Sequence, residues 1–308
     1  MIKNYQWIFL FLIPKDSPEF SNFNHYFKFS YMKKSSMSLL FSFCVISILS
    51  AQEHGLVKKW ETDSVFKVPE SVLFDAANKV LYVANIDGKD PWGADSAGSI
   101  GKMGADGKNI IVEWVKGLQA PKGMGLHNDK LYVADLTEIV VIDTKAGVIE
   151  KRIAVPGAVG LNDVSVDSKG VVYVSDSKGK KVFKIENGTA ELFIDNLKGP
   201  NGVLMHGKDF YVLDAGGLYK MNADKSLTMM ADGMEGGTDG VENVQGGDFI
   251  VSTWGGVVYY VNANGTKQTL MDGRANKMNS ADIGFDAKTK TVFIPTFWRN
   301  SVAAYEVK

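Results

Sequence analysis

The sequence predicts an all-β protein, a six-bladed β-propeller closed by an N-terminal strand that completes the last blade. Three observations predict it: one short strand recurs six times, its period is near 42 residues, and long helical periodicity is absent from the sequence. The second residues of the six strands are 82, 132, 173, 211, 250 and 293, which lie 50, 41, 38, 39 and 43 residues apart. This period in an all-β pattern is typical of propeller blades. A β-sandwich with coincidental spacing is the alternative.

The recurring strand is apolar and ends in small or polar residues. In chain order its copies read LYVAN at 81–85, LYVAD at 131–135, VYVSD at 172–176, FYVLD at 210–214, FIVST at 249–253 and VFIPT at 292–296. Each copy is expected to be the second strand of a blade.

The third unit shows the four strands that a blade needs. We expect its inner strand at 163–166, followed by strands at 171–175, 181–185 and 190–194. The turn-forming sequences Asp-Ser-Lys-Gly and Asn-Gly lie between them.

The two ends of the chain complement each other. The sequence stops after 301–307, where a third strand falls, so the sixth blade lacks its outermost strand. Residues 58–62, ahead of the first inner strand, can supply it. Joining both ends in one blade removes exposed sheet edges, which invite aggregation.

Composition changes near residue 51. All 32 glycines follow that point, whereas 8 of the 17 phenylalanines precede it. From Met32 the order is Lys33-Lys34, an apolar stretch at 37–49, then Ser50-Ala51, which is the pattern of a secretory signal peptide at 32–51. The apolar stretch is too short for a membrane span, which needs about 20 residues.

We therefore expect cleavage after Ala51 and an exported protein, periplasmic or extracellular. Residues 1–31 are interpreted as translation from a start codon upstream of the real one, a genuine N-terminal extension being the alternative. Residues 52–308 are expected to form a single six-bladed propeller domain.

Charge and cysteine content exclude several classes of function. Residues 52–308 hold 29 basic and 33 acidic side chains, a net charge of −4, without long runs of one sign. This pattern predicts no nucleic-acid partner. We also expect no membrane span in the mature form, and a monomer that binds a small molecule. The single cysteine, Cys44, excludes a disulfide framework and a cysteine zinc cluster.

Common catalytic motifs are also missing. His54 lies near the start of the domain, while His127 and His206 fall in turns between first and second strands, on the face opposite to the expected site. There is no Gly-x-Ser-x-Gly elbow. The fragment Gly123-Met124-Gly125 lacks the βαβ unit that a nucleotide loop requires.

Oxygen-bearing side chains recur where the chain enters an inner strand. They are Glu70, Asn162, Asn201 and Asp239 in the first, third, fourth and fifth units. Radial symmetry brings equivalent positions around one axis, so four oxygens and a charge of −2 can converge there. This set suits a divalent hard cation, and Ca²⁺ fits best. The alternative is that Asn and Asp before Gly only form turns; Glu70, a poor turn former, argues against it.

At these residues the sequence resembles the regucalcin (senescence marker protein)/gluconolactonase family of six-bladed β-propellers, and more distantly the paraoxonases. The resemblance covers essentially all of 56–308. In that family the first blade carries Glu at this point, usually as Glu-Gly-Pro, and later blades carry Asn-Asp, Asn-Gly and Asp-Gly. The sequence matches in type and order with Glu70, Asn162-Asp163, Asn201-Gly202 and Asp239-Gly240.

The resemblance implies that Glu70, Asn201 and Asp239 hold a divalent metal and that Asn162 contacts the metal or the substrate. Ser71-Val72 replaces the usual Gly-Pro. This departure leaves the metal interpretation intact but argues against assuming the family's usual sugar-lactone substrate.

Loops between second and third strands are expected to overhang the same mouth. The first, 88–98, explains the long first spacing and is interpreted as a lid bearing Trp92. Trp254, Trp298 and Arg299 also follow second strands and would offer apolar walls and one cation to a substrate. Packing between blades is the alternative for these side chains.

The leading hypothesis is a metal-dependent hydrolase of a lactone or related ester. The cation would polarise the carbonyl, and Asp239, or a water that it orients, would deliver the nucleophile. One alternative is a non-catalytic propeller with a structural channel ion, which binds a small molecule or a protein. Another is a sugar-binding or quinone-cofactor propeller.

Overall fold

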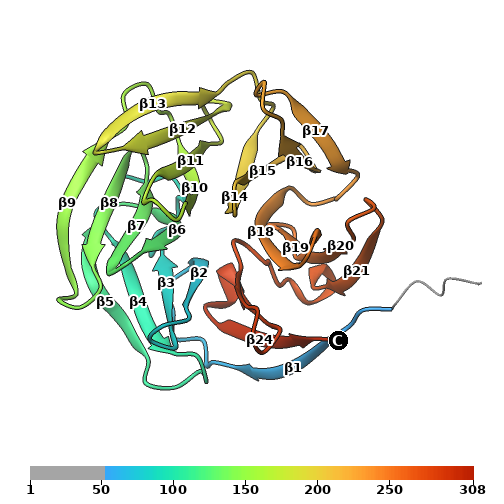
Figure 1. Ribbon diagram of the computed structural model, residues 1–308. Coiled ribbons are helices and arrows are strands. Elements are labelled where there is room, and N and C mark those ends of the chain that lie inside the picture. The colour runs from blue at the N-terminus through green and yellow to red at the C-terminus, as the bar shows by residue number, and fades with distance from the viewer. Residues whose placement is uncertain (1–52) are drawn as a thin grey trace, which may run out of the picture. The chain divides into compact units, whose positions relative to one another are not determined.

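Six four-stranded antiparallel sheets surround a common axis in the computed structural model, which describes residues 53–308 (Figure 1). These residues form one compact unit. The expected upstream segment 1–31 and signal peptide 32–51 lie outside the described residues. The prediction of a six-bladed β-propeller is confirmed.

The first three blades follow the chain from the axis outward. They comprise β2 (Pro69–Asp75), β3 (Val80–Asn85), β4 (Gly98–Gly104) and β5 (Ile111–Leu118); β6 (Pro121–His127), β7 (Lys130–Asp135), β8 (Glu138–Asp143) and β9 (Val148–Ala154); and β10 (Leu161–Val166), β11 (Val172–Asp176), β12 (Lys181–Glu186) and β13 (Thr189–Ile194). The strands of the third blade agree with the expected ones to within two residues.

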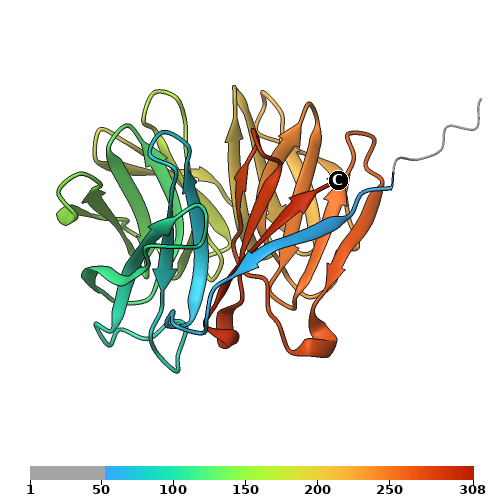
Figure 2. The ribbon, with the colours of Figure 1, turned by 90° about the horizontal axis from the view of Figure 1, so that it is seen from below.

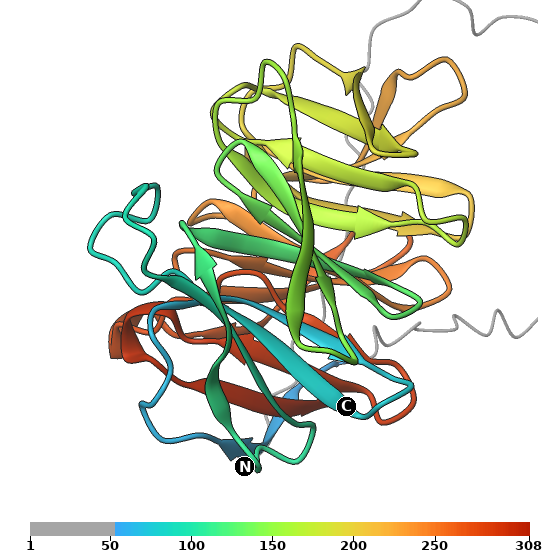
Figure 3. The same ribbon diagram turned by 90° about the vertical axis from the view of Figure 1, so that its left-hand side faces the viewer.

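The last three blades keep this order until the chain ends. They comprise β14 (Pro200–His206), β15 (Asp209–Asp214), β16 (Gly217–Met221) and β17 (Leu227–Ala231); β18 (Thr238–Gln245), β19 (Asp248–Thr253), β20 (Val257–Val261) and β21 (Lys267–Asp272); and β22 (Gly284–Asp286), β23 (Thr291–Pro295), β24 (Val302–Val307) and β1 (Leu56–Glu61). The helical segments of the described chain are two 3₁₀ turns, η1 (Arg274–Asn276) and η2 (Phe297–Arg299). Each blade is a twisted sheet, as a side view shows (Figure 3).

The N-terminal strand closes the ring. β1 pairs antiparallel with β24 from Leu56 opposite Val307 to Glu61 opposite Ala303, and the two strands run side by side (Figures 1 and 2). The sixth blade therefore contains both ends of the described chain, as the missing outer strand predicted.

The recurring second strand is apolar because neighbouring blades cover both of its faces. Every residue of β11 and β23 is buried. Large side chains fill the spaces between blades, and the rings of Trp60 and Phe74 lie 6.0 and 5.5 Å from that of Phe293.

The polar end of the repeat also has a structural cause. The Asp135 carboxylate accepts hydrogen bonds from the backbone N–H groups of Gln119 and Ala120, just before β6. Asp176 and Asp214 accept two backbone N–H groups in the same way ahead of β10 and β14. These aspartates fix the segment through which the chain enters each inner strand, and so position the residue that follows.

Candidate functional site

The inner strands of five blades begin with the same register. Each starts opposite the end of its second strand, and an irregularity of the ladder follows this first pair. The residue after the first pair therefore occupies an equivalent place near the axis in each blade. We call these five residues the axial ring: Glu70, Lys122, Asn162, Asn201 and Asp239.

The axial ring is largely removed from solvent. Glu70, Lys122 and Asp239 are 4%, 3% and 2% exposed. Asn162 is buried and Asn201 is half-buried. Burial makes each unpaired charge or polar atom in the ring costly, so its contacts indicate what the ring is suited to hold.

Two direct contacts join members of the ring. Asn201 Nδ2 donates a hydrogen bond of 3.0 Å to Asp239 Oδ1. The ammonium nitrogen of Lys122 lies 4.0 Å from Glu70 Oε1. Asn162 turns elsewhere, because its Nδ2 donates to Ser177 Oγ at 3.0 Å.

Two buried oxygens of the ring have no hydrogen-bond partner. Among the buried side-chain nitrogen and oxygen atoms of residues 53–308, Glu70 Oε2 and Asn201 Oδ1 are the two without one. A buried acceptor is normally satisfied, and a lone carboxylate or amide oxygen is the preferred ligand of a hard cation. The residues present therefore fit a divalent ion at the axis.

Burial also shifts the acid–base behaviour of the ring. It raises the pKa of Glu70 to about 7, against the opposing effect of Lys122. It raises the pKa of Asp239 well above its usual value, with further contributions from Glu70 and Asp282. Burial lowers the pKa of Lys122, against the attraction of Glu70 and Asp239.

A second layer of acids lies one residue further along the inner strands. Asp163 Oδ1 and Oδ2 accept the backbone N–H groups of Val164 and Val203 at 2.6 and 2.7 Å. Asp282 precedes β22, and its Oδ2 accepts a hydrogen bond of 2.6 Å from Ser71 Oγ.

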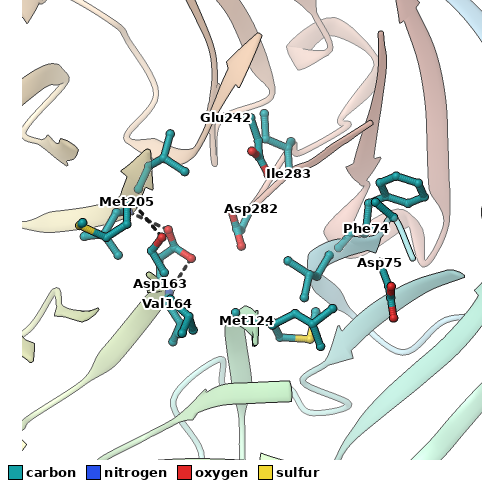
Figure 4. A pocket seen from close by; sticks show the side chains of 18 of the residues that line it. Phe74, Asp75, Met124, Asp163, Val164, Met205, Glu242, Asp282 and Ile283 are labelled. Carbon is teal, nitrogen blue, oxygen red and sulfur yellow. Dashed lines mark hydrogen bonds between the residues drawn. The ribbon is translucent and has the colours of Figure 1, made fainter. Parts of the chain in front are cut away.

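Below this layer the axis widens into a cavity of about 700 Å³ that reaches the opposite face. Asp163, Glu242 and Asp282 come from three different blades and point into it (Figure 4). Turns between first and second strands, at Asn78 and Asn128, form its outer end.

A separate pocket of about 480 Å³ lies at the mouth on the axial-ring side. Asn162 and Asn201 line it together with Ser177, Ala215 and Trp254. The last three residues follow second strands, so these loops overhang the mouth as the strand directions predicted.

Trp92 covers another part of the ring. Its ring centroid lies 4.3 Å from the ammonium nitrogens of both Lys122 and Lys178. The loop between β3 and β4 therefore reaches from the first blade to residues of the second and third.

Trp298 and Arg299 were expected at the same mouth as Trp254, and both lie in the short turn after β23. Both belong to η2, and neither lines the mouth pocket. Arg299 Nη2 lies 3.4 Å from Glu61 Oε1 on the outermost strand of the sixth blade. Trp254 packs edge-on against Phe297, which in turn contacts Trp298.

Sequence reasoning missed Lys122, Asp282 and the inward orientation of Glu242. A pattern of oxygen ligands excludes the lysine of the second blade, and Asp282 of the sixth blade lies ahead of the short strand β22. A signal for Lys122 was available, since Pro121-Lys122-Gly123 has the same form as Pro200-Asn201-Gly202.

Two further findings concern metals and membranes. Within residues 53–308, no group of three or more His, Cys, Asp or Glu side chains is arranged to hold a metal ion, so the expected site depends on the amides Asn162 and Asn201. No helix in the same residues is long and apolar enough to cross a membrane.

Comparison with known proteins identifies the fold. No family model and no curated protein matches the sequence. Among solved structures, a gluconolactonase from Xanthomonas campestris is 15% identical, with a TM-score of 0.64 over 82% of this chain and 89% of that one. A protein provisionally assigned as a gluconolactonase is also 15% identical, with a TM-score of 0.63 over 83% and 92% of the two chains.

The same architecture also carries other chemistry. A streptogramin B lyase is 11% identical, with a TM-score of 0.58 over 83% of this chain and 98% of that one. At such identities the likeness shows the propeller fold, while function depends on the residues grafted onto it.

Proposed function

We propose that the protein is a metal-dependent hydrolase of a lactone or related ester, similar in activity to gluconolactonases. The observation that carries the proposal is the pair of buried, unpartnered oxygens, Glu70 Oε2 and Asn201 Oδ1, beside a pocket at the propeller mouth. The gluconolactonases among the structural neighbours support the same class of substrate.

Glu70, Asn201 and Asp239 would hold the metal, with Asn162 at its edge or on the substrate. Carboxylate and amide oxygens favour Ca²⁺ over zinc, which prefers nitrogen and sulfur. When bound, the ion would supply Lewis-acid polarisation of the substrate carbonyl.

The protein's own groups account for substrate binding. The mouth pocket, at about 480 Å³, is of the size that small ligands occupy, about 300–1,000 Å³. Asn162 offers an amide and Trp254 an apolar wall to a molecule placed there. Trp92 lies over the Lys122 ammonium and would limit the access of water from the side of the first blade.

Asp239 is the candidate general base. The hydrogen bond from Asn201 Nδ2 holds one of its oxygens in place. A carboxylate fixed beside a substrate can take a proton from an attacking water.

The experiment is a panel of γ- and δ-lactones and simple esters, assayed with Ca²⁺ and with excess chelator. We expect turnover that the chelator abolishes, and a loss of about 100-fold or more in kcat for Asp239→Asn, the size of a missing general base. Asp232→Asn, on an exposed loop, is the matched control and should keep the parent activity.

Turnover that survives the chelator, or an Asp239→Asn variant as active as the parent, would contradict the proposal. Calcium binding without turnover of any lactone or ester would instead identify the non-catalytic propeller, in which the ion supports the channel and the mouth binds a ligand.

A further inference from the structure

Lys122 places a positive charge inside the ring that is proposed to hold a metal. It occupies the second blade's equivalent of Glu70, and only 3% of its surface is exposed. Burying an ammonium is costly unless an opposite charge compensates it.

The charge of the Lys122 ammonium is only partly compensated by its neighbours. Its one ion pair within residues 53–308 is with Glu70, at 4.0 Å, which is too long for a hydrogen bond. Glu70 Oε2 remains without a partner despite the nearby ammonium. The lysine therefore supplies charge to the ring without satisfying its oxygen ligands.

The ammonium also contacts a second group, the indole of Trp92. Its nitrogen lies 4.3 Å from the centroid of the Trp92 ring, on the side of the lid loop. A cation over the face of an indole is stabilised by the ring's quadrupole. Withdrawal from Glu70 would thus leave the ammonium in contact with Trp92.

We propose that Lys122 is an internal counter-ion that competes with the divalent metal for Glu70 and Asp239 and so holds the metal affinity of the ring down. The inference rests on the metal site of the proposed function. A divalent ion and an ammonium beside the same carboxylates repel each other strongly in a buried site. Loading of the metal therefore requires the ammonium to move away from Glu70.

Calorimetric titration of the full chain with CaCl₂ tests the proposal. Lys122→Met removes the charge and keeps the length of the side chain, and we expect it to bind Ca²⁺ at least tenfold more tightly than the parent. Lys178→Met is the matched control, because Lys178 contacts the same tryptophan from an exposed position, and its affinity should stay within about threefold of the parent, or roughly 0.7 kcal/mol.

A second variant keeps the test valid if Lys122→Met does not fold. Lys122→Gln also removes the charge but keeps a polar side chain, and it should show the same gain in affinity. Circular dichroism spectra like that of the parent establish that each variant is folded.

The outcomes separate the two proposals. Equal or weaker Ca²⁺ binding by both folded Lys122 variants, with binding by the parent, would overturn the competition while leaving the metal site intact. An absence of Ca²⁺ binding in the parent and in every variant would overturn the metal site itself, and the competition with it.

Discussion

At the scale of single residues, glycines make room for the acids of the second layer. A Cβ at Gly123 would lie 2.4 Å from Asp163 Oδ1, and one at Gly240 would lie 2.6 Å from Asp282 Oδ1. Both distances are shorter than any normal contact, so these positions exclude a side chain. Gly123 thus leaves space for Asp163 at the propeller axis. This role agrees with the sequence-based exclusion of a nucleotide loop at Gly123-Met124-Gly125.

The acids of the channel make stability depend on pH. Burial raises the pKa of Glu242 well above its usual value, with a contribution from Asp282, and raises the pKa of Asp282 itself to about 6. An acid whose pKa is higher in the folded protein stabilises it fully below the unfolded pKa, near 4. That stabilisation is lost as pH rises through the folded pKa, because the charged form is disfavoured in the channel.

Replacing Glu242 by glutamine should therefore remove part of this dependence. We expect the free energy of unfolding of Glu242→Gln, relative to the parent, to increase steadily as pH rises from 4 to 8. Urea denaturation at several pH values measures it, with the exposed Glu191→Gln as the control. A difference between variant and parent that is constant over this range would contradict the assignment.

Residue identity explains what could be predicted at the ring and what could not. Glu70, Asn201 and Asp239 were found because they recur at equivalent points of the repeat, and the structure brings Asn201 and Asp239 into contact. Lys122 occupies the equivalent point of the second blade. Its role as a charge beside Glu70 depends on burial and proximity, which a sequence pattern does not show. Asp282 was not predicted as a residue of the axis because β22 is short and begins only after it.

At the scale of elements, the loop between β3 and β4 departs most from the repeat. Its hydrogen bonds are mainly local, such as Trp92 N–H to Asp90 Oδ1 and Ala97 N–H to Asp95 Oδ1. Contacts outside the loop include the hydrogen bond from Ser96 N–H to Gln119 Oε1 and the ion pair between Asp87 and Lys67. Ordering such a segment is costly unless it covers something, and what it covers is Lys122 of the axial ring.

Shortening residues 88–98 to a tight turn should separate function from stability. We expect Tm to stay almost unchanged, because few core contacts are lost, while kcat/KM for the true substrate falls by about tenfold or more. Trp92→Ala in the intact loop should reproduce most of this fall. A shortened protein that melts much earlier would show that the loop is structural, and one with parental turnover would show that it is idle.

The loop after the last second strand shows the limit of reasoning from element order. Trp298 and Arg299 follow β23 as expected, but the short η2 turn directs Arg299 to Glu61 on β1. This contact depends on β1 joining the sixth blade, so a local pattern could not place the guanidinium. Trp254, in the fifth blade, does line the mouth with Asn162 and Asn201.

At the scale of the whole molecule, closure of the ring makes the site possible. β1 and β24 complete the sixth blade from opposite ends of the described chain, and this geometry holds five inner strands at one axis. Three features could be predicted from the sequence because each has a local cause: the period, the missing outer strand and the polar ends of the repeat. The substrate is not readable in this way, since the fold is shared with a gluconolactonase and with a streptogramin B lyase.

The central claim is that the axial ring is a divalent metal site. A crystal structure of the protein grown with Ca²⁺, with anomalous diffraction data, tests it most directly. We predict an anomalous peak on the propeller axis within about 2.3–2.6 Å of oxygens of Glu70, Asn201 and Asp239, with the Lys122 ammonium moved away from Glu70. A ring without such a peak at millimolar Ca²⁺, with Lys122 still beside Glu70, would contradict the account.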